Sequence, residues 1–501
     1  MKKILLIILS ILLVFPIVIS CSEKTDNENI STETNAVNAS DTTVADETEI
    51  QSLLPSDLDF DGQTVNILNC MYFVAESDNF MFNVTELSGD VVSDAVYERN
   101  LNTENQLNVK FELINKNMIS GDATQSLIKN SVLAGDKSFD MIFGIQFDCA
   151  PLVLDNMFHN LVGEEYLNLD QPWWAAAYNN ETSVGKDKLY FASGDITLGL
   201  IRNMSCMYFN KSFYNDMFGD PETLYNMVVD GKWTFDQYAE YNKQCYKDLN
   251  GDGVSDINDQ FGCGVITSNL TDHLTFDAGM RVTTRNTDGI PELTMNNEKM
   301  ATFTQKMYEL YYENPGIFVF PPTQEAIDVT IPTKFKANEM LFMLGWFLSS
   351  EMLRDMDVDY GIIPFPKYDE NQSTYLSLAH DVTTLTCIPV TCDKIDVVTA
   401  VMETLAFEGY KNVIPAYYEI ALKVKYVRDS TETALQIIDM IYENPTTDIA
   451  YVYNYALNSI GLIMRELMGN KKSDFVSAYT SKEKAVTTKF DTLIDLYTTL
   501  N

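Results

Sequence analysis

The sequence is poor in positive charge. Its 501 residues include 34 lysines and arginines against 72 aspartates and glutamates, which gives a formal net charge of −38. Nucleic-acid binding is excluded as a main function because the chain offers no cationic footprint for phosphates. The same deficit disfavours adhesion of the folded surface to anionic lipids. The excess of acidic residues bears on solubility rather than on the fold.

Cysteine pairs, histidines and catalytic motifs are also scarce. The eight cysteines form no CxxC pair, which excludes the common zinc-ribbon and thioredoxin-like spacings. Buried free thiols are expected for most of the cysteines, and the short Cys387–Cys392 spacing leaves a small disulfide loop as the alternative. The three histidines are isolated, and HExxH, GxSxG, GxGxxG and GxxxxGK[ST] do not occur. No catalytic centre is indicated.

The first residues have the pattern of an export signal. Met1-Lys2-Lys3 precedes an apolar run from Ile4 to Ile19, which ends in Val18-Ile19-Ser20-Cys21. The run is shorter than the roughly 20 residues that a membrane-spanning helix needs. We therefore predict a signal peptide over residues 1–20, with an uncleaved anchor helix as the alternative.

A polar segment follows this signal. Residues 22–51 are rich in Ser, Thr, Asn, Asp and Glu and contain no aromatic residue. Such a segment cannot bury enough apolar surface to offset the entropy lost on ordering, which predicts a disordered acidic tether over residues 21–55. No later segment offers 18 uninterrupted apolar residues.

The remaining sequence alternates strand and helix patterns, which predicts an α/β fold and excludes all-helical and all-β folds. The first unit is predicted to have βαβαβ order and a parallel sheet, with Ser93 as the N-cap of its first helix. The predicted elements are strands at 64–69, 109–113 and 139–143 and helices at 94–107 and 123–134. A second unit is predicted from Ile201 onward, with a capping box at Thr234–Gln237 and a strongly apolar run at Met340–Phe347.

Several motifs, in a fixed order along the whole chain, resemble the extracellular solute-binding proteins of bacterial ABC importers, of the large sugar-binding type. They are Gly89–Asn100, Gln171–Trp174, Tyr208–Lys211, Gly231–Thr234, the loop Asp248–Gly262 and Lys425–Asp429. The resemblance implies a two-lobed, periplasmic-binding-protein-like fold of type II with a ligand cleft between the lobes. It implies lobe one at 56–196 plus 362–408 and lobe two at 197–361 plus 409–501.

The same resemblance implies a function and a location. Val18–Cys21 resembles the bacterial lipobox, which implies cleavage before Cys21 and a lipid anchor on the extracytoplasmic face of the cell membrane. The protein is then expected to capture a sugar or oligosaccharide by lobe closure and to deliver it to ABC permease subunits, without enzymatic activity. Two alternatives stay open: a surface glycoside hydrolase with a carboxylate pair, and a sensory receptor that presents a sugar to a membrane kinase.

Aromatic residues indicate where a sugar would bind, because flat rings pack against the apolar faces of sugars. Trp346 follows Gly345 at the end of an apolar run, where sugar-binding relatives carry a stacking tryptophan; a core position is the alternative. For Trp173 and Trp174, one ring is expected to face the cleft and the other to pack beneath it. Polar partners are expected where strands end at the crevice. These candidates are Asn69, Tyr72, Gln146, Asp148, Asp195, Arg202, His380 and Asp381.

Asp248–Asp259 has the oxygen spacing of an EF-hand calcium loop, with glycine at the sixth place. Aspartate stands at the twelfth place instead of glutamate, and Ser255 stands at the eighth place instead of an apolar residue. We predict a structural Ca²⁺, with an ion-free Asp/Asn/Gly-rich surface turn as the alternative. The expected ligands are Asp248, Asn250, Asp252, the Val254 carbonyl, Asp256 and Asp259.

The N-terminal pattern leads to a first prediction. Mature protein from its native host should begin at a diacylated Cys21 and should partition with the membrane. Mass spectrometry of the N-terminal peptide should detect the lipid, and Cys21→Ala should accumulate as unprocessed precursor. Native protein that retains an unmodified Met1 would contradict this prediction.

Overall fold

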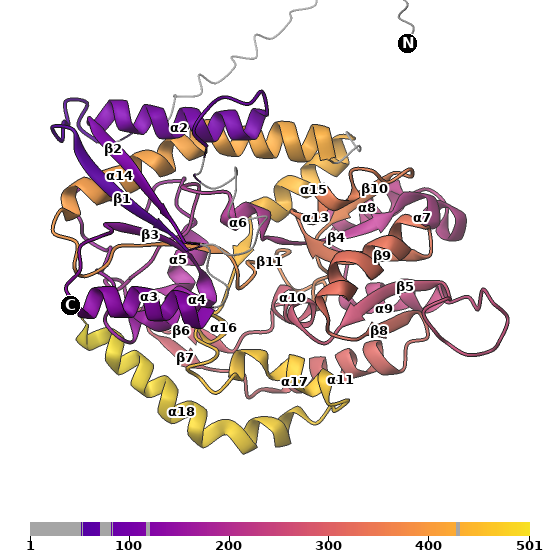
Figure 1. Ribbon diagram of the computed structural model, residues 1–501. Helices are drawn as coiled ribbons and strands as arrows, with labels where there is room; N and C mark the ends of the chain where they lie inside the picture. Colours follow the sequence, from indigo (N-terminus) through magenta and orange to yellow (C-terminus); the bar gives the residue numbers. More distant parts are fainter. Residues whose placement is uncertain are drawn as a thin grey trace, which may run out of the picture. The chain divides into compact units, whose positions relative to one another are not determined.

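The computed structural model describes Ser52, residues 54–70, Phe82, residues 84–116, residues 121–426 and residues 431–500. The signal segment, Cys21 and Tyr72 lie outside the described residues. Residues 52–501 form one unit, which contains two larger sheets and two short two-stranded pairs (Figure 1).

The first larger sheet has the strand order β12-β3-β1-β2. The strands β1 (Gln63–Asn69), β2 (Val109–Asn115) and β3 (Met141–Ile145) run parallel, which confirms the βαβαβ prediction. β12 (Thr384–Cys387) adds an antiparallel edge beside β3, so the sheet is mixed rather than purely parallel. All residues of β3 are buried, as expected for a strand covered on both faces.

Helices cover this sheet. α2 (Val91–Leu107) and α14 (Ile395–Glu408) lie side by side along one face, and α3 (Gly121–Leu133) packs on α4 (Gln146–Val153) (Figure 1). The N-cap of α2 is Asp90 and not Ser93. The helix begins at Val91, three residues before the predicted start, and the Asp90 carboxylate accepts the backbone N–H groups of Val92 and Ser93.

The second larger sheet has the order β10-β4-β9-β5-β8. β9 (Met340–Trp346) lies at its centre, between β4 (Ser205–Asn210) on one side and β5 (Phe261–Ile266) on the other. β5 runs parallel to β9 and to β8 (Ile317–Phe320), whereas β4 runs antiparallel to β9 and to β10 (Tyr360–Ile363). The apolar run at Met340–Phe347 thus supplies the central strand of this sheet.

The other elements connect and cover the two sheets. Thr234 is the N-cap of α9 (Phe235–Gln244), at the position that the capping-box pattern indicated: its hydroxyl accepts the N–H of Gln237. Within the described part of the chain, no helix is both long and apolar enough to cross a bilayer. The further elements are α5 (Ala176–Thr182), α6 (Gly199–Arg202), α7 (Lys211–Phe218), α8 (Glu222–Val229), α10 (Asn269–Asp277), β6 (Thr283–Arg285), β7 (Pro291–Leu293), α11 (Glu298–Tyr312), the π-helix η1 (Ala326–Thr330), α12 (Ile331–Lys336), α13 (Ser349–Leu353), β11 (Ser377–Leu378), the π-helices η2 (Gly409–Val413) and η3 (Ala416–Tyr426), α15 (Glu432–Tyr442), β13 (Pro445–Thr446), α16 (Ile449–Val452), the 3₁₀-helix η4 (Ile460–Leu462), α17 (Ile463–Gly469) and α18 (Phe475–Thr499).

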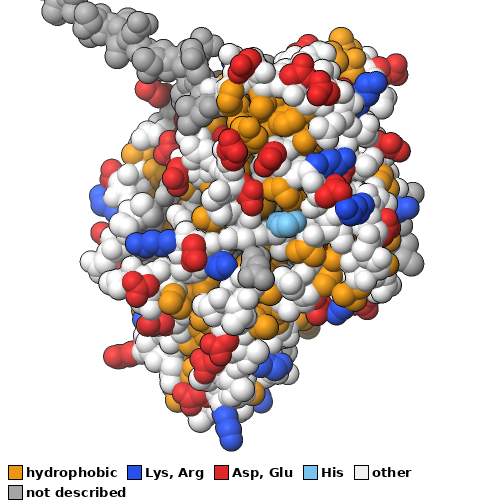
Figure 2. All heavy atoms as spheres, turned by 90° about the vertical axis from the view of Figure 1, so that its left-hand side faces the viewer, with side chains coloured by type: hydrophobic (Ala, Val, Ile, Leu, Met, Phe, Trp, Pro, Cys, Tyr) orange, Lys and Arg blue, Asp and Glu red, His pale blue; other side chains and the backbone are white. Residues whose placement is uncertain are grey.

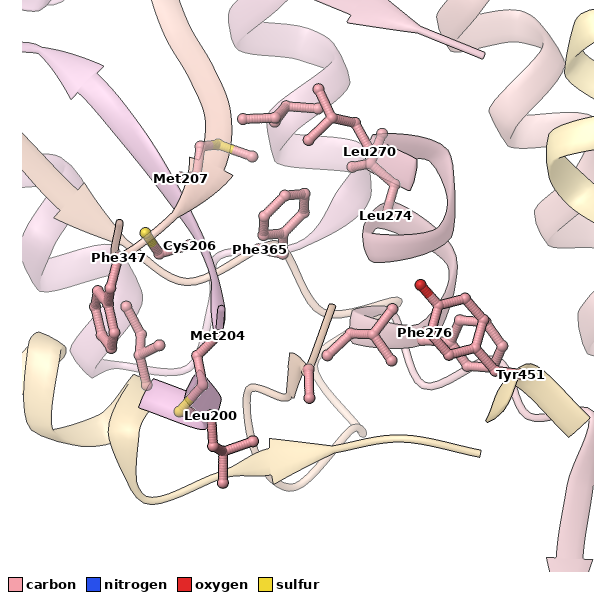
Figure 3. Close-up of a cluster of buried hydrophobic side chains, with 14 of the residues drawn as sticks. Leu200, Met204, Cys206, Met207, Leu270, Leu274, Phe276, Phe347, Phe365 and Tyr451 are labelled. Carbon is pink, nitrogen blue, oxygen red and sulfur yellow. The ribbon is translucent and has the colours of Figure 1, made fainter. Parts of the chain in front are cut away.

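Buried side chains from distant segments fill the region between α6, β4 and α10. Met204, Met207 and Leu274 belong to this cluster, together with Phe365 and Tyr451 (Figure 3). The seven cysteines of the described residues are buried and free, so the expected alternative of a Cys387–Cys392 disulfide is not formed. Acidic side chains are spread over the surface seen in Figure 2, among fewer Lys and Arg side chains.

Candidate ligand-binding site

A cavity of about 730 Å³ lies between the end of β9 and the chain segment that returns to the first sheet. Three predicted residues, Trp346, His380 and Asp381, line it. Its other walls come from Phe147, Asn203, Asn269, Gln324, Ile327, Asp328, Pro332, Met343, Leu344, Leu348, Ser349, Glu351, Met352, Arg354 and Val382. Two further cavities, both beside α18, contain none of the predicted site residues.

Backbone hydrogen bonds hold the segments around this cavity together. The carbonyl of Met204 accepts the N–H of Phe347 at 3.1 Å, and the carbonyl of Asn203 accepts the N–H of His380 at 3.0 Å. Asp381 in turn accepts the N–H of Phe147, at the start of α4, at 3.2 Å. Segments that are far apart in sequence thus meet at the cavity, and they belong to both larger sheets.

Trp346 is positioned by hydrogen bonds at both its backbone and its ring. Its backbone N–H donates to the Ser349 hydroxyl, and its indole N–H donates to Nε2 of His273 at 2.7 Å. The Trp346 ring meets His380 edge-on, with ring centroids 4.8 Å apart. The side chain is half-buried, so part of the indole surface faces the cavity.

His273 lies on α10 and is fully buried behind Trp346. Burial, together with the nearby His380, lowers the pKa of His273 well below its ordinary value of 6.5. The ring is therefore neutral. Because Nε2 accepts the indole N–H, the proton of this neutral ring must lie on Nδ1.

His380 and Asp381 form the polar end of the cavity. Nδ1 of His380 lies 2.8 Å from the Asp381 carboxylate, and Nε2 lies 2.8 Å from the Asn269 amide. Burial by itself would raise the pKa of Asp381, but the charge and hydrogen bond of His380 outweigh it and leave this pKa below its usual value. Asp381 is thus an ionised acceptor at the cavity wall.

Arg202 does not line the cavity but supports its wall from behind. Its guanidinium is fully buried and lies 3.3 Å from the Glu351 carboxylate, which does line the cavity. The ion pair fixes α13 against the end of α6, of which Arg202 is the last residue. Arg202 is therefore a positioning residue rather than a ligand contact.

The tandem tryptophans are not brought to the cavity. Trp173 and Trp174 are 0% and 2% exposed, and both indole N–H groups donate to the carboxylate of Glu403 on α14. The backbone N–H of Asn168 donates to the same carboxylate. Neither ring offers a face to a ligand, because both are held inside the core of the first lobe.

The polar candidates at the ends of the first sheet are also buried away from the cavity. Asn69 donates to Asn115, Gln146 accepts the Tyr178 hydroxyl, and Asp148 packs against Gly121 of α3. Asp195, a candidate near the crossover, is half-buried outside the cavity lining, and desolvation raises the pKa of its carboxyl well above its usual value. Asn69, Gln146 and Asp148 lie at the predicted sheet edge, but their side chains pack inside the protein.

Several residues in the cavity wall or behind it give no recognisable signal in the sequence. Asn269 follows β5, a strand that the sequence pattern does not indicate. Without a predicted strand end, Asn269 could not be recognised as a candidate. His273 appeared only as an isolated histidine. The apolar residues of η1 and α13 gave no signal, since single aliphatic side chains near strands are ordinary core residues.

The proposed calcium loop is a chain of turns closed by its own side chains. The Asp248 carboxylate accepts the N–H groups of Gly251 and Gly253, and Asp252 accepts the N–H of Val254. Asp259, which is fully buried, accepts the N–H groups of Leu249 and Asp256. In the described residues, no three His, Cys, Asp or Glu side chains converge into a metal-ligand group.

Comparison with solved structures identifies the fold. The galacto-N-biose/lacto-N-biose I-binding protein of the Bifidobacterium longum ABC transporter superimposes with a TM-score of 0.56 at 8% identity, over 87% of this chain and 98% of its own. UgpB from Mycobacterium tuberculosis, in complex with glycerophosphocholine, gives 0.53 at 13% identity, over 80% and 96%. A solute-binding protein from Thermotoga lettingae, bound with α-D-tagatose, gives 0.52 at 13% identity, over 86% and 100%.

These likenesses confirm the two-lobed α/β fold of ABC-transporter solute-binding proteins that the resemblance implied. No model of a protein family matches the sequence, and no curated protein matches it either. These neighbours are binding proteins with different small-molecule ligands: lacto-N-biose, glycerophosphocholine and α-D-tagatose.

The buried His273 leads to a second prediction, tested with His273→Gln, whose amide oxygen can accept the indole N–H. The unfolded chain protonates His273 below pH 6.5, whereas the folded protein keeps it neutral. Wild type should therefore lose about 1.4 kcal/mol of unfolding free energy, relative to the variant, for each pH unit below that value. Urea unfolding from about pH 7.5 to about pH 5.5 measures the difference, and parallel pH profiles would contradict the prediction.

Proposed function

We propose that the protein captures a carbohydrate in the cavity beside Trp346 and hands it to the membrane permease of an ABC transporter. The observation that carries the proposal is a half-buried indole, held by His273, beside the ionised Asp381. An aromatic face packs on a sugar ring, and a carboxylate accepts hydrogen bonds from its hydroxyls. The shared fold of solute-binding proteins supports the same proposal.

Lobe closure is the proposed means of capture. The cavity is bounded by Phe147 from the first lobe and by β9 and α13 from the second, so a ligand here contacts both lobes. Contacts on both lobes favour the closed state over the open one, and only this difference in affinity can shift the population.

The hydrolase alternative has weaker support from the same carboxylates. Glu351 is engaged by the buried Arg202, and the pKa of Asp381 lies below its usual value. A general acid needs a raised pKa, so neither group has the character that the acid of a glycosidase pair requires. We therefore expect no turnover, and intact sugar should be recovered after prolonged incubation.

We further propose that Cys21 anchors the protein to the extracytoplasmic face of the membrane, where a permease would receive its ligand. We also propose that the loop Asp248–Asp259 binds a structural Ca²⁺. The spacing of its oxygens supports this, and the pKa of Asp248, lowered by the N–H groups of Gly253 and Gly251, favours the anionic form a hard cation needs. Calcium would have to compete with the hydrogen bonds within the loop.

A third prediction concerns Trp346. Once thermal-shift screening of mono- and oligosaccharides, with α-D-tagatose, lacto-N-biose and maltotetraose among them, has identified a ligand, Trp346→Ala should weaken its binding about ten- to a hundredfold. The reason is loss of the aromatic platform, so Trp346→Phe should weaken binding less. Isothermal titration calorimetry measures the affinities.

Tyr455→Ala is the control for this series, because Tyr455 is an exposed aromatic residue, 66% accessible, outside the cavity. It should leave the affinity unchanged. Unaltered binding by Trp346→Ala, together with a loss of about 3–5 kcal/mol in unfolding free energy, would instead assign Trp346 to the core.

A fourth prediction tests calcium. At a hundredfold excess over its dissociation constant, Ca²⁺ should stabilise the folded protein by about 2–3 kcal/mol, because it binds the folded loop only. Asp252→Ala should abolish this effect, whereas Asp216→Ala, at an exposed position on α7, should retain it. Melting temperatures that are equal in chelator and in millimolar Ca²⁺ would show that the loop is an ion-free turn.

A further inference from the structure

One group of polar residues of the cavity is connected by hydrogen bonds. Asn203, Asn269, His380 and Asp381 are joined through His380, whose N–H donates to the Asn203 carbonyl and whose ring contacts the other two. Trp346 stands beside this group, with its ring edge-on to His380. One sugar ring on the Trp346 face would therefore have hydrogen-bonding partners within reach.

The wall contributed by η1, α12, β9 and α13 is mainly aliphatic. Of its polar members, Ser349 accepts the Trp346 N–H, Glu351 is paired with Arg202, and Asp328 is exposed at the rim. Its aliphatic members are Ile327, Pro332, Met343, Leu344, Leu348 and Met352. These elements pack on one another, and the six side chains line the same cavity. Ile327, Leu348 and Met352 are only half-buried and keep apolar surface free towards the cavity.

Such a wall is a poor match for a plain oligosaccharide. Aliphatic side chains have no donors or acceptors, so sugar hydroxyls pressed against them would lose water without gaining a partner. They also lack the flat faces on which sugar rings stack; the aromatic residues of the cavity wall are Phe147 and Trp346. An alkyl, acyl or aryl group has no hydrogen bonds to water to lose, so its burial against this wall is favourable.

We propose that the natural ligand is a glycoside that carries an apolar substituent. Its sugar lies on Trp346 with hydroxyls directed to Asp381 and its neighbours, and its apolar group lies against Leu348, Met352 and Ile327. The proposal rests on the proposed function, since it assigns the sugar to the same site. The exposed side chains of Asp328 and Arg354 remain at the rim, in water.

The test compares methyl with octyl glycosides of glucose, galactose, mannose and maltose, by calorimetry on the full mature chain below micelle-forming concentrations. The octyl compound of at least one pair should bind at a single site, tenfold or more tightly than its methyl partner. Met352→Gln should reduce the octyl affinity about three- to tenfold and leave the methyl affinity unchanged, because it makes the aliphatic wall polar.

Two variants serve as controls. Met352→Leu should keep the octyl preference, because it keeps the wall apolar. Met217→Gln makes the same substitution on α7 at an exposed methionine outside the cavity, 43% accessible, and should bind both partners as wild type does. Melting curves establish that each variant is folded.

The outcomes separate this inference from the proposed function. Equal affinity within every pair, or binding of unsubstituted oligosaccharides alone, would overturn the inference and leave carbohydrate capture intact. Octanoate that binds the same site as tightly as the octyl glycosides would overturn carbohydrate capture itself. Binding of no glycoside and no free sugar would overturn both.

Discussion

A small set of backbone hydrogen bonds holds together the segments that form the candidate cavity. The segments around Asn203, Phe347 and His380 are far apart in sequence, yet their N–H and carbonyl groups pair directly. Phe147 extends the set to the first helix turn after β3 through the Asp381 carbonyl. Since backbone pairing does not depend on side-chain type, the side chains of Asn203, Phe147, His380 and Asp381 remain available to line the cavity.

Two buried carboxyl groups join further segments that are distant in sequence, and each accepts hydrogen bonds from donors on those segments. Asp448 accepts N–H groups from Val282 and Thr283, and Asp277 accepts the Ser205 hydroxyl and the N–H of Leu378. A buried acceptor is stabilising only while its donors stay in place, because an unpaired one carries the full cost of desolvation. These contacts therefore favour one arrangement of the segments that they join.

The elements with local signals could be predicted, and those without them could not. β1 follows from its buried apolar residues, and α9 follows from its capping box. β5 was missed because two glycines weaken its pattern; at Gly264 any side chain would collide with the Phe320 ring, so packing requires glycine there. The place of Trp173 and Trp174 depends on Glu403, far along the chain, and no spacing in the sequence joins them.

The site was predicted in part for the same reason. Trp346, His380 and Asp381 stand where strands or their connections end, which a pattern along the chain can locate. Asn69, Gln146 and Asp148 satisfy the same rule, yet the first lobe uses their polar atoms internally. Whether a strand-end side chain turns outward or inward depends on packing partners, and these become known only once the chain is folded.

The burial of three of the four tryptophans has an optical consequence. Trp173, Trp174 and Trp233 are 0–2% exposed, whereas Trp346 keeps part of its indole at the cavity. The emission of the three buried rings is insulated from solvent, and that of the fourth depends on what occupies the space beside it. The protein thus carries an intrinsic fluorophore at its candidate site, and filling of the cavity can be followed by light without any label.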